Sequence, residues 1–351
     1  MTRTPASWRF IALAGVLFAL LWPGTAAAHG EEGLNDTDYR VTVTEQPRLP
    51  GVEVREVEAG ARLELRNTGD RSVEILGYER EPYAEIRPEG VFVNVNSPAS
   101  YLNETTDPDA RVPAAASPAL APEWDKVSDE PVIRWHDHRA GWMNAQPPPV
   151  VTADPSRPHK VLDWDIPLRS GTQLYTVSGT VEWVPPPAAA TWWAAALLLA
   201  GGLFVATFKP ADLRPVAGLV GVLGLAAIAD AVGRAVTSAE LETGWLAALV
   251  VNQSWQLLAG VAGVGAAVYA LRRGSAADLA LGIAAAALAL LSGLSHVSCL
   301  SAAITPTPWG GDLTRVLTVA ALGAGTGVAV GVLARMRQPG RTTDTAGAST
   351  A

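Results

Sequence analysis

The chain divides at residues 183–208, which read WVPPPAAATWWAAALLLAGGLFVATF. Three consecutive prolines lack the N–H groups that a strand ladder needs, and they favour a stiff, extended spacer. The run from Ala190 to Phe208 holds no charged residue and is long enough to cross a hydrocarbon core of about 30 Å. We therefore predict an all-β domain before the prolines and an α-helical membrane bundle after them.

About five transmembrane helices are predicted in the second half of the chain, because each apolar segment there is long enough to span a bilayer. The segments are Ala190–Phe208, Val216–Val236, Trp245–Leu271, Leu279–Leu300 and Leu313–Met336. Glycines recur on two of them, and small residues let membrane helices approach closely. These glycines are Gly260, Gly263 and Gly265, then Gly323, Gly325, Gly327 and Gly331.

The distribution of charge predicts the orientation, because basic residues concentrate in loops that stay in the cytoplasm. With the first segment running inward, the inner loops carry Lys209, Arg214, Arg272, Arg273, Arg335, Arg337 and Arg341. The outer loops then carry only Arg234 and Arg315, beside Glu240, Glu242 and Asp312. We predict a multi-pass protein of the cell membrane, in contact with the lipid bilayer, with its N-terminal domain outside. Residues 190–336 form the membrane domain, and residues 337–351 form a disordered cytoplasmic tail.

Residues 1–28 have the pattern of a secretory signal peptide. Arg3 and Arg9 provide the positive region, and an apolar run extends from Phe10 to Leu21. Small residues at Ala26–Ala28 fit a cleavage site. Cleavage after Ala28 would leave His29 as the first residue of the mature protein.

Residues 29–184 have the pattern of an extracytoplasmic β-sandwich. Apolar and polar residues alternate in Tyr39–Val43 and in Leu63–Leu65, which is typical of half-buried strands. Asn67–Asp70 reads as a turn between two strands. Short strands with frequent Gly and Pro between them favour an immunoglobulin-like sandwich. Residues 185–189 are the proline-rich spacer that follows it.

Composition limits the classes of function. The outer domain carries nearly twice as many acidic as basic side chains, which argues against nucleic acid because phosphates are bound by Lys and Arg. The chain has one cysteine, Cys299, so no internal disulfide forms. No phosphate-binding glycine loop, nucleophile elbow or zinc-protease motif occurs in the sequence, so we predict a protein that is not an enzyme.

Two histidines lie close together in the stretch Trp135–Arg139. If this stretch is a strand, His136 and His138 point to the same face with Cα atoms roughly 6.5–7 Å apart, a spacing at which two imidazoles can bind one metal ion. A mature N-terminal His29 would add a chelate through its amine and Nδ1. Three such nitrogen ligands suit Cu(II), so these histidines are the predicted metal ligands.

In these features the chain resembles the periplasmic copper carriers of copper-resistance systems, which are small β-sandwiches that begin with histidine. It resembles lytic polysaccharide monooxygenases in the N-terminal histidine alone. The resemblance implies that His29 is the terminal copper ligand and that His136 or His138 is the distal one. Met143 is the one methionine between residues 29 and 184, which departs from a methionine-rich Cu(I) site.

The same stretch has a second interpretation as a structural corner. In that case Asp137 pairs with Arg139, and the imidazoles form hydrogen bonds to the backbone, as histidines in sandwiches commonly do.

A second polar set lies within the apolar segments, in the predicted outer half of the bilayer. Asp230 and Arg234 are one turn apart, Asn252 and Gln256 would share a helix face, and so would His296 and Cys299. Ionisable residues at this depth are candidates for function. The alternative is that Asp230 and Arg234 form an ion pair and the others bond helix to helix.

Three functions are compatible with these patterns, of which the third, an oxidative copper enzyme, is the least favoured because no substrate-binding feature is visible. The first is a membrane-anchored, extracytoplasmic protein that binds or handles a metal, with copper as the expected ion and Asp230, His296 and Cys299 receiving it. The second is a structural or interaction module of the cell envelope that contacts a protein partner without metal chemistry.

Overall fold

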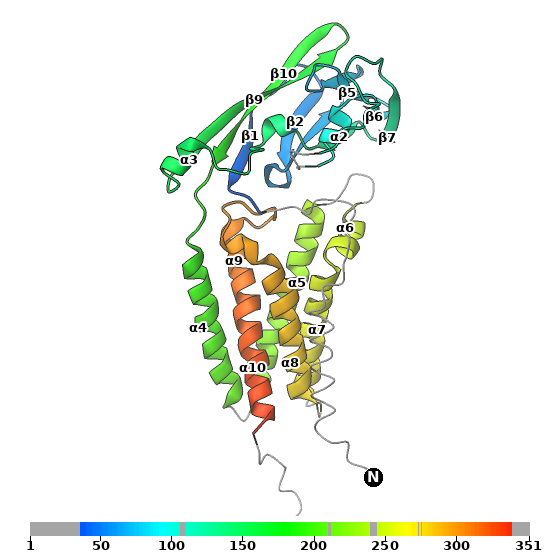
Figure 1. Cartoon of the computed structure of the whole chain (residues 1–351). Coiled ribbons are helices and arrows are strands. Elements are labelled where there is room, and N and C mark those ends of the chain that lie inside the picture. Colours follow the sequence, from blue (N-terminus) through cyan, green and yellow to red (C-terminus); the bar gives the residue numbers. More distant parts are fainter. Residues whose placement is uncertain are drawn as a thin grey trace, which may run out of the picture. The chain divides into compact units, whose positions relative to one another are not determined.

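The computed structural model describes residues 36–105, 110–209, 212–238, 244–272, 274 and 276–338. A β-rich N-terminal region is followed by a helical region (Figure 1). The predicted signal peptide, His29 and residues 339–351 of the predicted tail lie outside the described residues.

The described part of the N-terminal region contains ten strands, and all of their pairings are antiparallel. The strands are β1 (Tyr39–Glu45), β2 (Val52–Val57), β3 (Arg62–Asn67), β4 (Val73–Leu76), β5 (Pro82–Arg87), β6 (Gly90–Asn94), β7 (Trp124–Ser128), β8 (Val132–Trp135), β9 (His159–Ser170) and β10 (Gln173–Trp183). Short helical turns are η1 (Glu58–Gly60), α2 (Ala99–Leu102), η2 (His138–Ala140) and α3 (Pro149–Ala153). The larger sheet has the order β1-β10-β9-β4-β5-β6-β7, and the smaller has the order β2-β3-β8.

One apolar core joins the two sheets. The smaller sheet contributes Val54, Leu63, Leu65, Ile133 and Trp135, and the larger contributes Ile75, Ile86, Ile166, Leu168, Val177 and Val181. Along the second half of β10, buried residues alternate with partly exposed ones, so one face of the strand is turned toward this core. The prediction of a β-sheet domain is therefore confirmed. Its division into seven and three strands differs from the four and three of a constant-type immunoglobulin domain.

The proline spacer separates the last strand from the first long helix, since β10 ends at Trp183 and α4 begins at Ala189. The helical region comprises α4 (Ala189–Phe208), α5 (Arg214–Thr237), α6 (Gly244–Asn252), α7 (Ser254–Leu271), α8 (Ala277–Leu288), η3 (Ala289–Gly293), η4 (Leu294–Leu300), α9 (Gly311–Val319), η5 (Ala320–Ala324) and α10 (Gly325–Met336).

Five helices of the described residues are long and apolar enough to cross a membrane, which confirms the prediction of five such segments. They are Ala189–Phe208, Arg214–Thr237, Ser254–Leu271, Ala277–Leu300 and Gly311–Met336. The third predicted segment is divided, because α6 ends at Asn252 and α7 begins at Ser254.

Glycines let the helix backbones approach closely. This prediction is confirmed for all of the predicted glycines except Gly265. A Cβ atom on Gly323 would lie 2.6 Å from the carbonyl oxygen of Ala196, and one on Gly327 would overlap that of Ala200. Gly331 continues this line one turn further along α10. These three glycines form a track in which the backbone of α4 lies. Gly265 differs, because a Cβ there would meet no atom within 4 Å among the described residues.

We expect Gly327→Val to lower the free energy of unfolding by about 1–3 kcal/mol, because its side chain would overlap the backbone of α4. Thermal unfolding in detergent, followed by tryptophan fluorescence, would measure the change. Gly265→Val is the matched control, since it makes the same chemical change on an exposed helix face. Equal unfolding temperatures for the two variants would contradict the role given to the track.

Candidate functional site

The stretch Trp135–Arg139 forms a corner. Strand β8 ends at Trp135, and His138 begins the single turn η2. The prediction that His136 and His138 lie on one strand is therefore wrong. The strand ends here because the Asp137 side chain accepts hydrogen bonds from the Trp135 indole at 3.0 Å and from the backbone N–H of Arg139 at 3.1 Å, and these bonds curl the chain.

Each imidazole of the corner is bonded to a backbone carbonyl. His136 Nδ1 lies 2.7 Å from the carbonyl oxygen of Ala61, and His138 Nε2 lies 2.7 Å from that of Thr105. The two rings thus use different nitrogens and different partner segments. The backbone N–H of His138 also donates to the hydroxyl of Tyr78 at 3.1 Å. This is the arrangement of the second interpretation, in which the histidines fasten the corner to the rest of the domain.

Asp137 and Arg139 form the buried ion pair of the corner. The Asp137 side chain is fully buried and lies 2.8 Å from Arg139 Nη2. The guanidinium also donates to the carbonyl oxygens of Leu76 and Gly77 and lies 4.9 Å from the centre of the Tyr78 ring. Burial by itself would lower the pKa of Arg139, but its bond and attraction to Asp137 outweigh burial and raise that pKa. The arginine therefore stays charged and clamps β8 to the turn after β4.

The copper site keeps the status of a prediction. Within the described ranges, no three His, Cys, Asp or Glu side chains are grouped closely enough to hold one metal ion. The predicted terminal ligand, His29, lies outside those ranges.

A polar groove of about 250 Å³ lies on the smaller sheet, lined by Glu53, Arg55, Glu64 and Arg66. Strand register explains it, because Glu64 on β3 is directly opposite Arg55 on β2 and Arg134 on β8. Its carboxylate accepts hydrogen bonds from Arg55 Nη2 at 2.7 Å and from Arg134 Nε at 2.8 Å. Burial alone would raise the pKa of Glu64, but these two arginines together lower it. The charges of Glu64, Arg55 and Arg134 in and beside the groove are therefore paired with one another.

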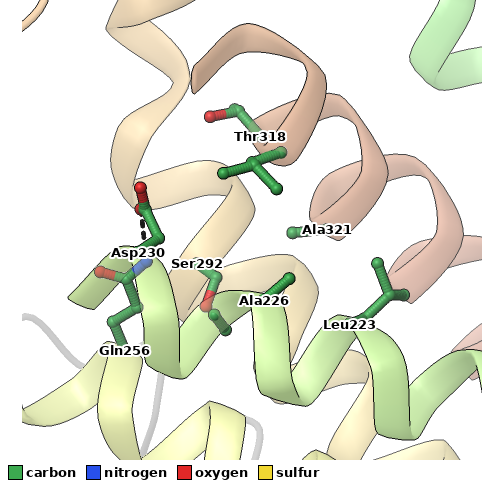
Figure 2. Close-up of a pocket in the computed structure, with 9 residues that line it drawn as sticks. Leu223, Ala226, Asp230, Gln256, Ser292, Thr318 and Ala321 are labelled. Carbon is green, nitrogen blue, oxygen red and sulfur yellow. Dashed lines mark hydrogen bonds between the residues drawn. The ribbon is translucent and has the colours of Figure 1, made fainter. Parts of the chain in front are cut away.

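The polar set in the helices centres on Asp230, which is 6% exposed. Its Oδ2 accepts hydrogen bonds from Arg234 Nε and Gln256 Nε2, each at 2.8 Å, and its Oδ1 accepts one from Trp309 Nε1 at 3.0 Å. The bond to Gln256 is visible in Figure 2. One carboxylate therefore joins α5, α7 and the loop before α9. This matches the predicted alternative of an ion pair with interhelical hydrogen bonds.

Asn252 is not part of this centre. It ends α6 and is exposed, whereas Gln256 lies in α7 and is buried. The prediction that the two share a helix face is wrong, because the chain leaves helical geometry at Gln253 (φ −119°, ψ 10°) between them.

His296 and Cys299 also have separate partners. His296 Nδ1 lies 3.0 Å from the carbonyl oxygen of Ser292, and the buried Cys299 thiol lies 3.3 Å from Thr318 Oγ1. The backbone at His296 has non-helical angles (φ −115°, ψ 19°), so the helical spacing that predicted a shared face does not apply.

A small cavity of about 20 Å³ adjoins Asp230 (Figure 2). Its lining consists of Leu223, Ala226, Ala227, Asp230, Gln256, Ser292, Leu317, Thr318 and Ala321. Two buried atoms, Gln256 Oε1 and Ser292 Oγ, have no hydrogen-bond partner among the described residues. An unmet buried polar atom costs about 1–3 kcal/mol, so such atoms mark places where a further contact is expected.

Two helical segments beside the cavity are wound as π-turns, namely η3, which contains Ser292, and η5, which contains Ala321. They pack tightly, because a Cβ on Gly293 would lie 2.7 Å from the Cα of Leu322. Single π-turns inside helices occur frequently at functional sites.

Arg315 shapes the loop between η4 and α9, and sequence reasoning gave it no role. It is 5% exposed and donates to the carbonyl oxygens of Cys299 at 3.0 Å, Ala302 at 2.7 Å and Ala303 at 3.1 Å. An arginine within an apolar segment was the available signal. Ser292, Thr318 and Trp309 were also missed, and a hydroxyl or indole in an apolar sequence gives no comparable signal.

The same loop is hydrogen-bonded to the segment that leads into β1. Thr37 and Ile304 exchange backbone hydrogen bonds of 3.0 and 2.8 Å, and Asp38 Oδ1 accepts from the N–H of Ala303 at 2.8 Å. Burial raises the pKa of Asp38, and the bond from Ala303 offsets part of that rise.

Comparison with protein-family models, with curated protein sequences and with solved structures finds no match for this chain.

We expect Asp230→Asn to lower the free energy of unfolding by roughly 3–5 kcal/mol, because Arg234 would lose its counter-charge at a buried site. Thermal unfolding in detergent would measure the loss. Asp163→Asn is the control, since that carboxylate also pairs with a cationic side chain, Lys160, but both partners are exposed. The double change Asp230→Asn with Arg234→Gln should recover part of the loss. An Asp230→Asn variant that unfolds at the wild-type temperature would disprove the role of Asp230 in holding these helices together.

We expect Glu64→Gln to lower the free energy of unfolding of the β domain by about 1–3 kcal/mol at neutral pH. The folded-state pKa of Glu64 is lowered, so its contribution is present above its ordinary pKa of 4.5 and is lost as the pH falls through the lowered value. The difference between wild type and Glu64→Gln should therefore shrink in acid. Urea unfolding at several pH values would measure it, with the exposed Glu53→Gln as control. A difference that grows in acid would contradict this assignment.

Proposed function

We propose that this chain is a multi-pass protein of the cell membrane that carries its β domain outside and its C-terminus in the cytoplasm. Five helices of sufficient length and apolarity support the membrane part of the proposal. The excess of Lys and Arg in alternate loops supports the orientation. The signal-like sequence of residues 1–28 supports export of the β domain, with cleavage after Ala28. Two antiparallel sheets around one core support an immunoglobulin-like fold for the β domain. The division of its strands into sheets of seven and three argues against that fold.

Within this protein, we propose that the β domain acts as a structural or protein-interaction module of the cell envelope. The observation that carries the proposal is the corner at Trp135–Arg139. The imidazoles of His136 and His138 are bonded to carbonyl oxygens, and the Asp137 carboxylate is bonded to Arg139 and Trp135. These bonds give the two histidines a structural role, which supports the proposal. The Asp230 centre supports the same conclusion, because a carboxylate bonded to Arg234, Gln256 and Trp309 ties helices together.

Copper handling by His29 with His136 or His138 is the second candidate. One observation favours it: the Nδ1 of His136 is held by a backbone carbonyl, as is common for imidazoles whose other nitrogen binds a metal. In this scheme the terminal chelate of His29 would complete the ligand set.

Titration of Cu(II) into the mature chain with its native N-terminus separates the two candidates. For the interaction module we expect micromolar-or-weaker binding that does not change when one residue is added before His29. His136→Gln should lower the free energy of unfolding by about 0.5–1.5 kcal/mol without altering copper affinity. His159→Gln is the matched control for copper affinity. It also removes an imidazole bonded to a carbonyl oxygen, that of Asp154, but His159 is not one of the predicted copper ligands. Tight binding that is lost in the extended chain or in His136→Gln would establish the copper candidate instead.

The interaction itself is tested by photo-crosslinking in cells from exposed positions of the β domain. Leu174 on β10 and Val127 on β7 are 60% and 44% exposed. A crosslinker at these positions should give a discrete protein adduct, whereas one at Leu198 on α4 should give none. The absence of an adduct from both β positions would count against an interaction module.

A further inference from the structure

The cavity beside Asp230 is lined by two buried polar atoms that have no hydrogen-bond partner among the described residues. Gln256 is 4% exposed and Ser292 is 5% exposed, and each has a side-chain oxygen without a partner among the described residues. Figure 2 shows both side chains around one pocket, with Thr318 on a third helix. The amide nitrogen of Gln256 is bonded to Asp230, so its oxygen is left to accept a hydrogen bond from something else.

The size of the cavity limits the ligand. About 20 Å³ is close to the smallest space that holds a water molecule, and it is too small for an organic substrate. The ligand must donate a hydrogen bond to Gln256 Oε1 and exchange one with the hydroxyl of Ser292.

The charge of the site limits the ligand further. Asp230 and Arg234 are 2.8 Å apart and neutralise each other, so a cation in the cavity would leave an unbalanced charge among apolar helices. An anion would lie against the Asp230 carboxylate. A neutral donor of the size of water is the species that meets all of these conditions.

We propose that one water molecule is a bound constituent of the helical bundle, bridging Gln256 on α7 and Ser292 on η3 beside Asp230. It extends the Asp230 network from α5 and α7 to η3, which has no direct bond to that carboxylate among the described residues. This inference is independent of the role proposed for the β domain.

The test is an experimental structure of the full chain in lipid nanodiscs, at a resolution that orders buried water. We expect a density peak about 2.7–3.2 Å from both Gln256 Oε1 and Ser292 Oγ. The peak should disappear in Ser292→Ala and persist in Ser295→Ala. Ser295 is the matched control because it is exposed and its hydroxyl donates to the carbonyl oxygen of Leu291.

A second measurement distinguishes water from a small cation. Thermal unfolding temperatures in sodium, potassium and choline chloride at equal ionic strength should coincide, because a neutral ligand has no counter-ion preference. A higher unfolding temperature in one metal salt, absent in Ser292→Ala, would show that the cavity binds that cation and not water, and it would overturn the proposal. A wild-type structure with no peak between Gln256 and Ser292 would also overturn it.

Discussion

The constraint on which this structure depends is that a charge removed from water needs an opposite charge and hydrogen bonds nearby. Three buried carboxylates meet it in the same way, with an arginine as partner. Asp137 has Arg139, Glu64 has Arg55 and Arg134, and Asp230 has Arg234. Hydrogen bonds from these groups also reach other segments of the chain: Arg139 donates to the turn after β4, Glu64 accepts from β2 and β8, and Asp230 accepts from α7 and from the loop before α9.

These bonds have a cost for any ligand chemistry. A carboxylate that already accepts three or four hydrogen bonds has little capacity left for a metal ion, and removing its arginine would leave it unbalanced. The imidazoles of His136 and His138 are each bonded to a backbone carbonyl through one ring nitrogen.

The sequence was sufficient for features that repeat along many residues. Five apolar stretches and the glycines of the fifth one give the spans and their close packing, because every residue of such a pattern carries the same signal. It was insufficient where one local bond decides the outcome. The side chain of Asp137 ends β8 at Trp135, before either histidine, and the break at Gln253 separates Asn252 from Gln256. The candidate site was half predicted: Asp230, Arg234 and Gln256 do meet, while Ser292, Thr318 and Trp309 reach it only through helix packing that no local pattern encodes.

The glycine track on η5 and α10 has a consequence for how the protein is made. Helix α4 is the first span to leave the ribosome, and the backbone groove that receives it, at Gly323, Gly327 and Gly331, belongs to the last. At about 5–20 residues per second, the stretch from Ala200 to Gly327 takes roughly 6–25 s to synthesise. For that time α4 has no α10 to pack against, so assembly of the bundle ends with the closure of its first long helix onto its last.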